Sequence, residues 1–184
     1  MVSAQISPNP ETCKYNKGYY IDNDSNVVEG FLRYEDYDYI YFKDSLEIKN
    51  SKAKILYPKD VKLVHINGCT IIKGGNFSLR IRSSLPKVNV KEAFIEIAEE
   101  GSINLYRCRV LSMSAQFGEF NDYLLVRWTD SDDFIPLPFR HSKMRKKLIE
   151  IFDDGELAME MINKRIKNKD APGIIRKYNE LHAD

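Results

Sequence analysis

Tyrosines at alternating positions are the residues of this chain whose type and spacing best suit binding chemistry. Tyr37, Tyr39 and Tyr41 follow a period of two, which places side chains on one face of a β-strand. Ile40 and Phe42 then point to the other face. Burying these two leaves no polar atom unpaired, whereas each tyrosine hydroxyl buried without a partner costs about 1–3 kcal/mol. We therefore expect Ile40 and Phe42 to face the core and the three tyrosines to face solvent.

Carboxylates flank this predicted tyrosine stripe. Glu35, Asp36 and Asp38 lie beside it in the sequence. A tyrosine offers a rigid contact area with a polar tip, and carboxylates at the rim accept hydrogen bonds. The sequence therefore predicts a binding surface for a glycan or a basic peptide, made of Tyr37, Tyr39, Tyr41, Asp36 and Asp38. The alternative interpretation is that the tyrosines only pack across neighbouring strands.

The residue types that usually carry catalysis form no coherent group in the sequence. The three histidines, His65, His141 and His182, are not paired at metal-ligand spacing, and no Gly-x-Ser-x-Gly motif marks a hydrolase nucleophile. Clustered carboxylates at residues 35–38 and 130–133 leave a hydrolase acting on a glycan or peptide as the alternative. Neighbouring acids in turns are usually solvated and not catalytic. Because none of these residue types forms a catalytic or ligand-binding group, we expect no catalytic residue, no metal and no cofactor.

Two short motifs resemble ion-binding or phosphate-binding loops but depart from them at the decisive positions. Residues 22–26 begin like an EF-hand loop, yet Val27 stands where that loop needs glycine and Arg33 where it needs a bidentate glutamate. Residues 73–76 hold a glycine pair without the Gly-Lys-Ser/Thr ending of a phosphate loop. Both segments are therefore predicted to be turns or bulges between strands.

The overall charge argues against a nucleic-acid partner. Lys and Arg total 28 and Asp and Glu total 27, which gives a net charge of +1. A domain that binds nucleic acid is usually more basic, and we expect the basic residues gathered after residue 140 to lie on solvated helix faces. No apolar run approaches the roughly 18 residues of a membrane-spanning helix, so no transmembrane segment is predicted.

Short strands separated by turn-forming residues are predicted from residue 17 to 141. Asn67-Gly68 is the strongest hairpin signal, because both residues tolerate positive φ. Further hairpin turns are expected at residues 22–26, 99–102 and 130–133. Pro136 and Pro138 lack a backbone donor, so the last strand is expected at a sheet edge.

Helical periodicity follows the strands. Ser142 is predicted to cap a first helix, and residues 153–155 to end it. Asp170 is predicted to cap a later helix that has Pro172 in its first turn. The helices are expected to pack on the sheet through one apolar face, formed by Leu148, Ile151, Phe152, Ile162 and Tyr178.

Strands first and helices last favour an α+β fold. We expect a curled antiparallel sheet, arranged as a sandwich or partial barrel, followed by two or three C-terminal helices, because many short twisted strands seldom stay flat. Residues 1–16 are predicted to be an N-terminal extension and residues 17–141 the β module. Residues 142–184 are predicted to be a helical tail packed on the same domain.

The cysteines and the first residues bear on the cellular compartment. The chain has three cysteines, Cys13, Cys69 and Cys108, and none forms a C-x-x-C pair. A disulfide between Cys69 and Cys108 would require an oxidising compartment; the alternative is that they are buried free thiols. Val2-Ser3-Ala4-Gln5 has small residues at the spacing of a signal-peptidase site, without the basic and apolar regions that precede such a site.

Three stretches of the chain resemble segments of uncharacterised envelope and secreted proteins of the Bacteroidetes. The likeness covers about residues 17 to 180 and consists of a hairpin, a turn and a helical tail that closes in Tyr-Asn. The matching residues are Gly18-Tyr19-Tyr20-Ile21 with Val28-Glu29-Gly30-Phe31-Leu32, then Tyr57-Pro58-Lys59-Asp60-Val61, and finally Leu137-Pro138-Phe139-Arg140, Leu148 to Phe152 and Ile174 to Asn179.

This resemblance implies export and a binding or structural role, and it transfers no catalytic residue to this chain. It agrees with the signal-peptidase-like site at Ala4-Gln5. We therefore expect a non-enzymatic, periplasmic or extracellular protein whose partner is a glycan, a peptide or another envelope protein. A cytoplasmic location and a hydrolase activity are the alternatives.

Overall fold

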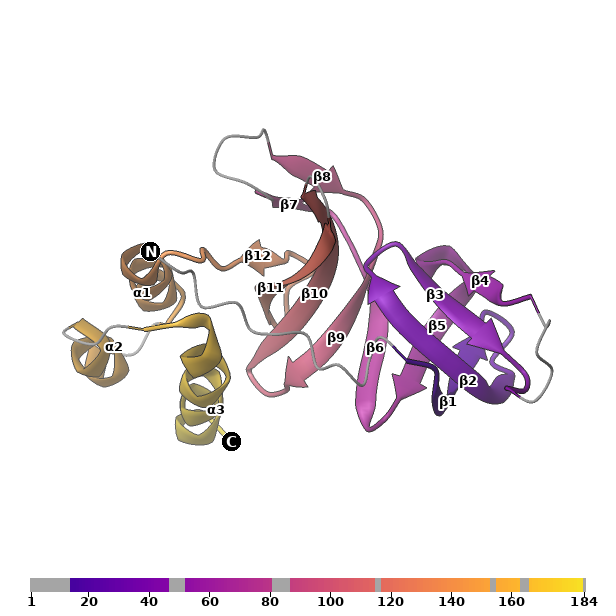
Figure 1. The fold of residues 1–184 in the computed structure, drawn as a ribbon. Helices are drawn as coiled ribbons and strands as arrows, with labels where there is room; N and C mark the ends of the chain where they lie inside the picture. Colours follow the sequence, from indigo (N-terminus) through magenta and orange to yellow (C-terminus); the bar gives the residue numbers. More distant parts are fainter. Residues whose placement is uncertain are drawn as a thin grey trace. The chain divides into compact units, whose positions relative to one another are not determined.

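The computed structural model describes residues 14–46, 52–80, 87–114, 117–152, 155–162 and 166–183. It has the predicted α+β fold, a largely antiparallel sheet followed by C-terminal helices (Figure 1). Its contacts divide the chain into two compact units. The N-terminal unit comprises residues 1–97 and 107–122, and the C-terminal unit comprises residues 98–106 and 123–184. This division groups the helices with parts of three strands, whereas the sequence-based boundary fell at residue 141.

Ten strands form one sheet in the order β12-β11-β10-β9-β6-β5-β1-β2-β3-β4, and β7 pairs with β8 in a second, two-stranded sheet. The two ends of the large sheet are β12 and β4, so the strand that contains Pro136 lies at an edge as predicted. The strands are β1 Asn16–Asp22, β2 Val27–Asp36, β3 Tyr39–Lys43, β4 Lys54–Leu56, β5 Val61–Ile66, β6 Cys69–Gly74, β7 Phe77–Leu79, β8 Val88–Val90, β9 Ala93–Glu99, β10 Ile103–Ser114, β11 Phe117–Trp128 and β12 Ile135–Pro136.

The predicted hairpin turns are confirmed, and their residues explain them. Between β5 and β6, Asn67 and Gly68 adopt φ values of 50° and 80°. Both values are positive, as a two-residue hairpin turn requires. Between β1 and β2, the Asp22 carboxylate accepts hydrogen bonds from the backbone N–H groups of Asp24 and Asn26, at 2.9 and 2.8 Å. An Asp side chain that accepts hydrogen bonds from backbone N–H groups a few residues later stabilises a turn in this way.

The large sheet curls within the N-terminal unit. The Tyr34 hydroxyl, on β2, donates a hydrogen bond of 2.8 Å to the Phe94 carbonyl oxygen on β9, and it accepts one from the Arg109 backbone N–H on β10. The Phe94 N–H donates to the carbonyl oxygen of Tyr37, just after β2. Because β2 and β9 are separated by three strands in the sheet order, these bonds require the sheet to bend back on itself.

The curl encloses an apolar core in the N-terminal unit. Its members alternate along β2 and β3, as a strand with one buried face requires, and further members come from β1, β4, β5, β6 and β9. They are Tyr20, Leu32, Tyr34, Ile40, Phe42, Leu56, Val61, Val64, Ile66, Ile71 and Phe94.

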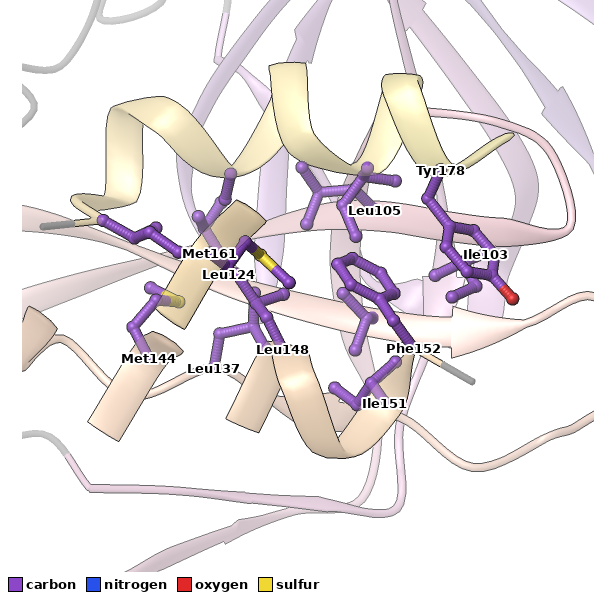
Figure 2. Packing of buried hydrophobic residues seen from close by; sticks show 14 of the residues in the cluster. Ile103, Leu105, Leu124, Leu137, Met144, Leu148, Ile151, Phe152, Met161 and Tyr178 are labelled. Atoms are coloured by element: carbon purple, nitrogen blue, oxygen red, sulfur yellow. The ribbon is translucent and has the colours of Figure 1, made fainter. Parts of the chain in front are cut away.

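The C-terminal unit has its own core, built from three helices and the adjoining strand segments. The helices are α1 His141–Ile151, α2 Gly155–Ile162 and α3 Ala171–Leu181, and short 3-10 turns occupy Pro58–Asp60 and Asn168–Asp170. Figure 2 shows the helix side chains meeting those of β10 and β11. The predicted contacts of Leu148, Ile151, Phe152 and Tyr178 are confirmed, whereas the side chain of Ile162 lies outside the described residues. None of the helices in the described part of the chain is long and apolar enough to cross a membrane.

The structure confirms the position of one predicted helix cap, Asp170, and corrects the other, Ser142. Arg140, not Ser142, occupies the N-cap position of α1, and its side chain makes no capping hydrogen bond. Ser142 lies inside the first turn because the helix begins one residue earlier, at His141. Asp170 does occupy the N-cap position of α3, but its carboxylate makes no hydrogen bond to the helix. It accepts a hydrogen bond from the N–H of Lys167, three residues earlier in the chain, at 2.7 Å. Asp170 therefore stabilises the turn before α3 instead of the helix N–H groups.

Candidate binding surface

The predicted orientation of β3 is confirmed at its centre. Ile40 and Phe42 are buried in the core of the N-terminal unit, with exposed fractions of 0% and 4%. Tyr39 and Tyr41 point to the opposite face of the sheet and are half-buried there. Their rings form an edge-to-face pair with centroids 5.1 Å apart. Two of the three tyrosines of the predicted stripe therefore lie side by side on the outer face.

Tyr37 does not belong to this stripe. It lies with Asp38 in the turn between β2 and β3, and β3 begins only at Tyr39. The strand pairing shifts register between Tyr34 and Asp36, which pairs with Tyr39, so the period of two does not run through the turn. The Asp36 carboxylate accepts the N–H of Tyr37 at 2.8 Å. The expectation of three tyrosines on one strand face is therefore wrong for Tyr37.

Arg33 is the central residue of the surface, and the sequence analysis did not single it out. It pairs with Tyr41 across β2 and β3, and its guanidinium carbon lies 4.6 Å from the centroid of the Tyr41 ring. On its other side it lies 5.0 Å from the centroid of the Tyr15 ring. The Lys43 ammonium lies 5.2 Å from that same Tyr15 ring. We call this group, Tyr15, Arg33, Tyr39, Tyr41 and Lys43, the tyrosine–arginine cluster.

Two signals could have revealed this cluster. The hairpin register of β2 and β3 places Arg33 opposite Tyr41, and that register follows from the position of the turn. Tyr15 was assigned to the extension of residues 1–16, but β1 begins at Asn16, directly after it. The tyrosine is therefore held beside the sheet by the first strand.

Two hydroxyls of the cluster, those of Tyr39 and Tyr15, have raised pKa values. Burial raises the pKa of Tyr39 to about 12, with further contributions from its hydrogen bond to Tyr41 and from the Asp36 and Asp38 carboxylates. Burial also raises the pKa of Tyr15, although Arg33 beside it acts in the opposite direction. A protonated tyrosine hydroxyl both donates and accepts, so these rings can bind polar groups at their rim.

The charge on the surface differs from the predicted acidic rim. The Tyr15 end carries Arg33 and Lys43, and the Glu35 carboxylate lies 3.2 Å from the Arg33 Nε atom. The Tyr39 end adjoins Asp36 and Asp38, whose carboxylates act on the pKa of Tyr39. The two predicted acids therefore lie at one end of the stripe, while its other end is cationic.

The strands beneath the cluster have no free edge. β1 pairs with β2 and β5, β2 with β1 and β3, and β3, which carries Tyr39, Tyr41 and Lys43, pairs with β2 and with the edge strand β4. Their backbone donors and acceptors are therefore engaged in the sheet along most of their length. A ligand on this face would meet side chains only.

A second polar group lies in the interior of the N-terminal unit. The Arg109 side chain is 2% exposed, and its Nε atom donates to Asp122 at 3.1 Å. Arg107 donates to the Glu96 carboxylate at 2.9 Å. Arg107 also lies 3.9 Å from the Asp122 carboxylate, so the two arginines and the two carboxylates form one charged network across β9, β10 and β11.

The two cysteines within the described residues are free thiols. Cys108, on β10, is buried, and burial raises the pKa of its thiol well above its usual range. Cys69, on β6, is half-buried, and burial and the Glu96 carboxylate raise its pKa. Both thiols are therefore poor nucleophiles. Cys13 lies outside the described residues, and the part of the chain that is described holds no group of three metal-ligating side chains.

Comparison with known protein families, with characterised proteins and with solved structures finds no match to this chain. Its function therefore has to be argued from the site itself.

Proposed function

We propose that the protein is an exported, non-enzymatic module that binds a partner through the tyrosine–arginine cluster. The observation that carries this proposal is an arginine held between two tyrosine rings on the solvent-facing side of a sheet. Aromatic and arginine side chains supply most of the binding energy at many recognition surfaces, because they combine large contact area with polar tips. The proposal of export rests on the resemblance to envelope proteins and on the signal-peptidase-like residues 2–5.

The charged groups of the chain favour binding over the hydrolase alternative. Asp130, Asp132 and Asp133 are exposed in the turn between β11 and β12. Glu96 and Asp122, which are buried, hold arginines as described above. A glycosidase needs two carboxyl groups that face each other across the scissile bond. The pairing of Glu96 and Asp122 with arginines therefore gives no support to such an activity.

The proposal is tested with the full chain on glycan and peptide arrays. We expect binding that is lost in the double variant Tyr39→Ala/Tyr41→Ala and retained in Tyr57→Ala, which removes an exposed tyrosine outside the cluster. Equal binding by wild type and the double variant would remove the cluster from consideration. Release of cleaved products from a bound glycan or peptide would favour the hydrolase.

The compartment needs a separate experiment. We expect fractionation of cells that express the native gene to place the protein outside the cytoplasm. Recovery with cytoplasmic markers alone would contradict the proposed export and would leave the binding surface unaffected.

A further inference from the structure

We infer that the tyrosine–arginine cluster binds an acidic saccharide, a uronic-acid polysaccharide whose carboxylate is held by Arg33 between the rings of Tyr15 and Tyr41. This inference rests on the proposed function, because it names the ligand of the same surface. It also replaces the basic peptide that the acidic neighbours of the tyrosines suggested from sequence alone.

The charge on this part of the outer face favours an anion. Lys17 pairs with Phe31, and Phe31 pairs with Lys43, so the two lysines lie in one row across β1, β2 and β3. Arg33 lies two residues further along β2 and shares that face. The nearest carboxylate, Glu35, contacts only the Nε atom of Arg33. Three cations and one carboxylate leave this end of the face positive, although exposed Glu29 follows further along β2.

The guanidinium of Arg33 is oriented for a planar anion. Within the described residues its interactions are the Nε contact with Glu35 and the two ring contacts with Tyr15 and Tyr41. Its terminal amino groups therefore remain to be satisfied by solvent or by a ligand. The side chain is 29% exposed, so those groups can be reached from outside. A guanidinium fixed between two rings presents a rigid fork, which matches the two oxygens of a carboxylate.

A saccharide fits this surface better than an acidic peptide does. An extended peptide gains much of its affinity by adding a strand to a free sheet edge, and the strands that carry most of the cluster, β2 and β3, both have strands on either side, whereas the edge is β4. The ligand must then be recognised through its own polar groups and flat apolar faces. Tyr39 and Tyr41 offer ring faces for the C–H groups of a sugar, and the protonated Tyr39 hydroxyl can donate to a sugar oxygen.

The experiment is a calorimetric titration of the full chain with an oligogalacturonide and with the same oligomer methyl-esterified. Esterification removes only the negative charges, so we expect it to weaken binding roughly 10-fold or more. Arg33→Gln should cause a similar loss. Arg33→Lys should recover little affinity, because an ammonium cannot form the two parallel hydrogen bonds. Lys146→Gln removes an equal charge at an exposed position of α1, outside the cluster, and should bind like wild type.

The outcomes separate this inference from the proposed function. Equal affinity for the acid and the ester, undiminished binding by Arg33→Gln, or binding of a sulfated oligosaccharide alone would overturn the inference. An array ligand of another kind that is lost in Tyr39→Ala/Tyr41→Ala would overturn it and leave the proposed function standing. No ligand in either experiment would overturn both. Circular dichroism establishes that each variant is folded, and Lys43→Gln gives a second test of the same cationic end.

Discussion

Asn179 binds the main chain of Ile103 as a neighbouring strand would. Its side-chain oxygen accepts the Ile103 N–H at 3.0 Å, and its side-chain nitrogen donates to the Ile103 carbonyl oxygen at 2.9 Å. The same nitrogen donates to the Glu100 carbonyl oxygen at 3.2 Å. One amide on α3 thus satisfies three backbone groups at the start of β10. This contact fixes the helix to the strand independently of the apolar core.

Replacing Asn179 with alanine is expected to destabilise the C-terminal unit. The variant leaves partly buried backbone groups of Ile103 without their partner, which costs about 1–3 kcal/mol in the free energy of unfolding. Chemical denaturation measures the change. Glu180→Ala, at the neighbouring exposed position of α3, is the control and should change stability by less than about 0.5 kcal/mol. Equal effects of the two substitutions would contradict the assigned role.

Gly101→Ala is expected to act through the same asparagine. A Cβ atom at position 101 would lie 2.3 Å from the Cγ atom of Asn179, so the amide would have to move away from Ile103. The double variant Gly101→Ala/Asn179→Ala should then cost less than the sum of the two single changes, by about 0.5 kcal/mol or more. The same denaturation series measures this coupling. Additive effects would show that the amide keeps its hydrogen bonds when the methyl group is present.

Tyr34→Phe should destabilise the N-terminal unit. The substitution keeps the ring and removes the hydroxyl that bonds the Phe94 carbonyl and the Arg109 N–H in the buried interior. We expect a loss of about 1–3 kcal/mol in the free energy of unfolding. Tyr19→Phe is the matched control. The half-buried ring of Tyr19 stacks on His65, and removing the Tyr19 hydroxyl should hardly change the free energy of unfolding. Equal losses of stability in the two variants would mean that the hydrogen bonds of the Tyr34 hydroxyl do not stabilise the curled sheet.

The buried thiol of Cys108 should make stability fall at alkaline pH. Burial raises its pKa in the folded protein, while an unfolded cysteine titrates near pH 8.5. The folded state therefore keeps a proton that the unfolded state loses, so its contribution is complete below about pH 8.5 and declines as pH rises above that value. Denaturation between pH 7 and 9.5 should show a steeper decline for wild type than for Cys108→Ala. Parallel curves would contradict this assignment.

Local patterns predicted the hairpins and the helical faces because short-range chemistry determines them. Asn67-Gly68 has the backbone freedom that its turn requires, and Ile40 and Phe42 alternate toward the core. The Tyr-Asn ending noted in the sequence also has a physical basis. Tyr178 stacks on Phe152 with centroids 4.7 Å apart, and Asn179 binds Ile103. Both residues stabilise the helical unit, so this part of the resemblance reports on fold.

The features that the sequence analysis missed depend on which strands become neighbours. Arg109 and Asp122 meet because β10 and β11 are neighbours in the sheet, and no turn between these two strands was predicted from the sequence. Arg33 could be recognised as part of a binding surface only from its contacts with the rings of Tyr15 and Tyr41, which lie on other segments of the chain. Tyr37 was misplaced because a register shift breaks the period of two just before the turn. The prediction assumed one regular strand from Tyr37 to Tyr41, whereas β3 begins at Tyr39.

The division of the chain into two units has a consequence for its biosynthesis. Residues 107–122 belong to the N-terminal unit but interrupt the C-terminal unit, whose segments are 98–106 and 123–184. On a ribosome, the first unit can close once residue 122 has left the exit tunnel. Residues 98–106 emerge earlier, but the hydrogen bond between Ile103 and Asn179 can form only after Asn179 has been translated. Nascent chains long enough to expose residue 122 but not Asn179 would therefore carry one completed unit and an unsatisfied apolar strand segment.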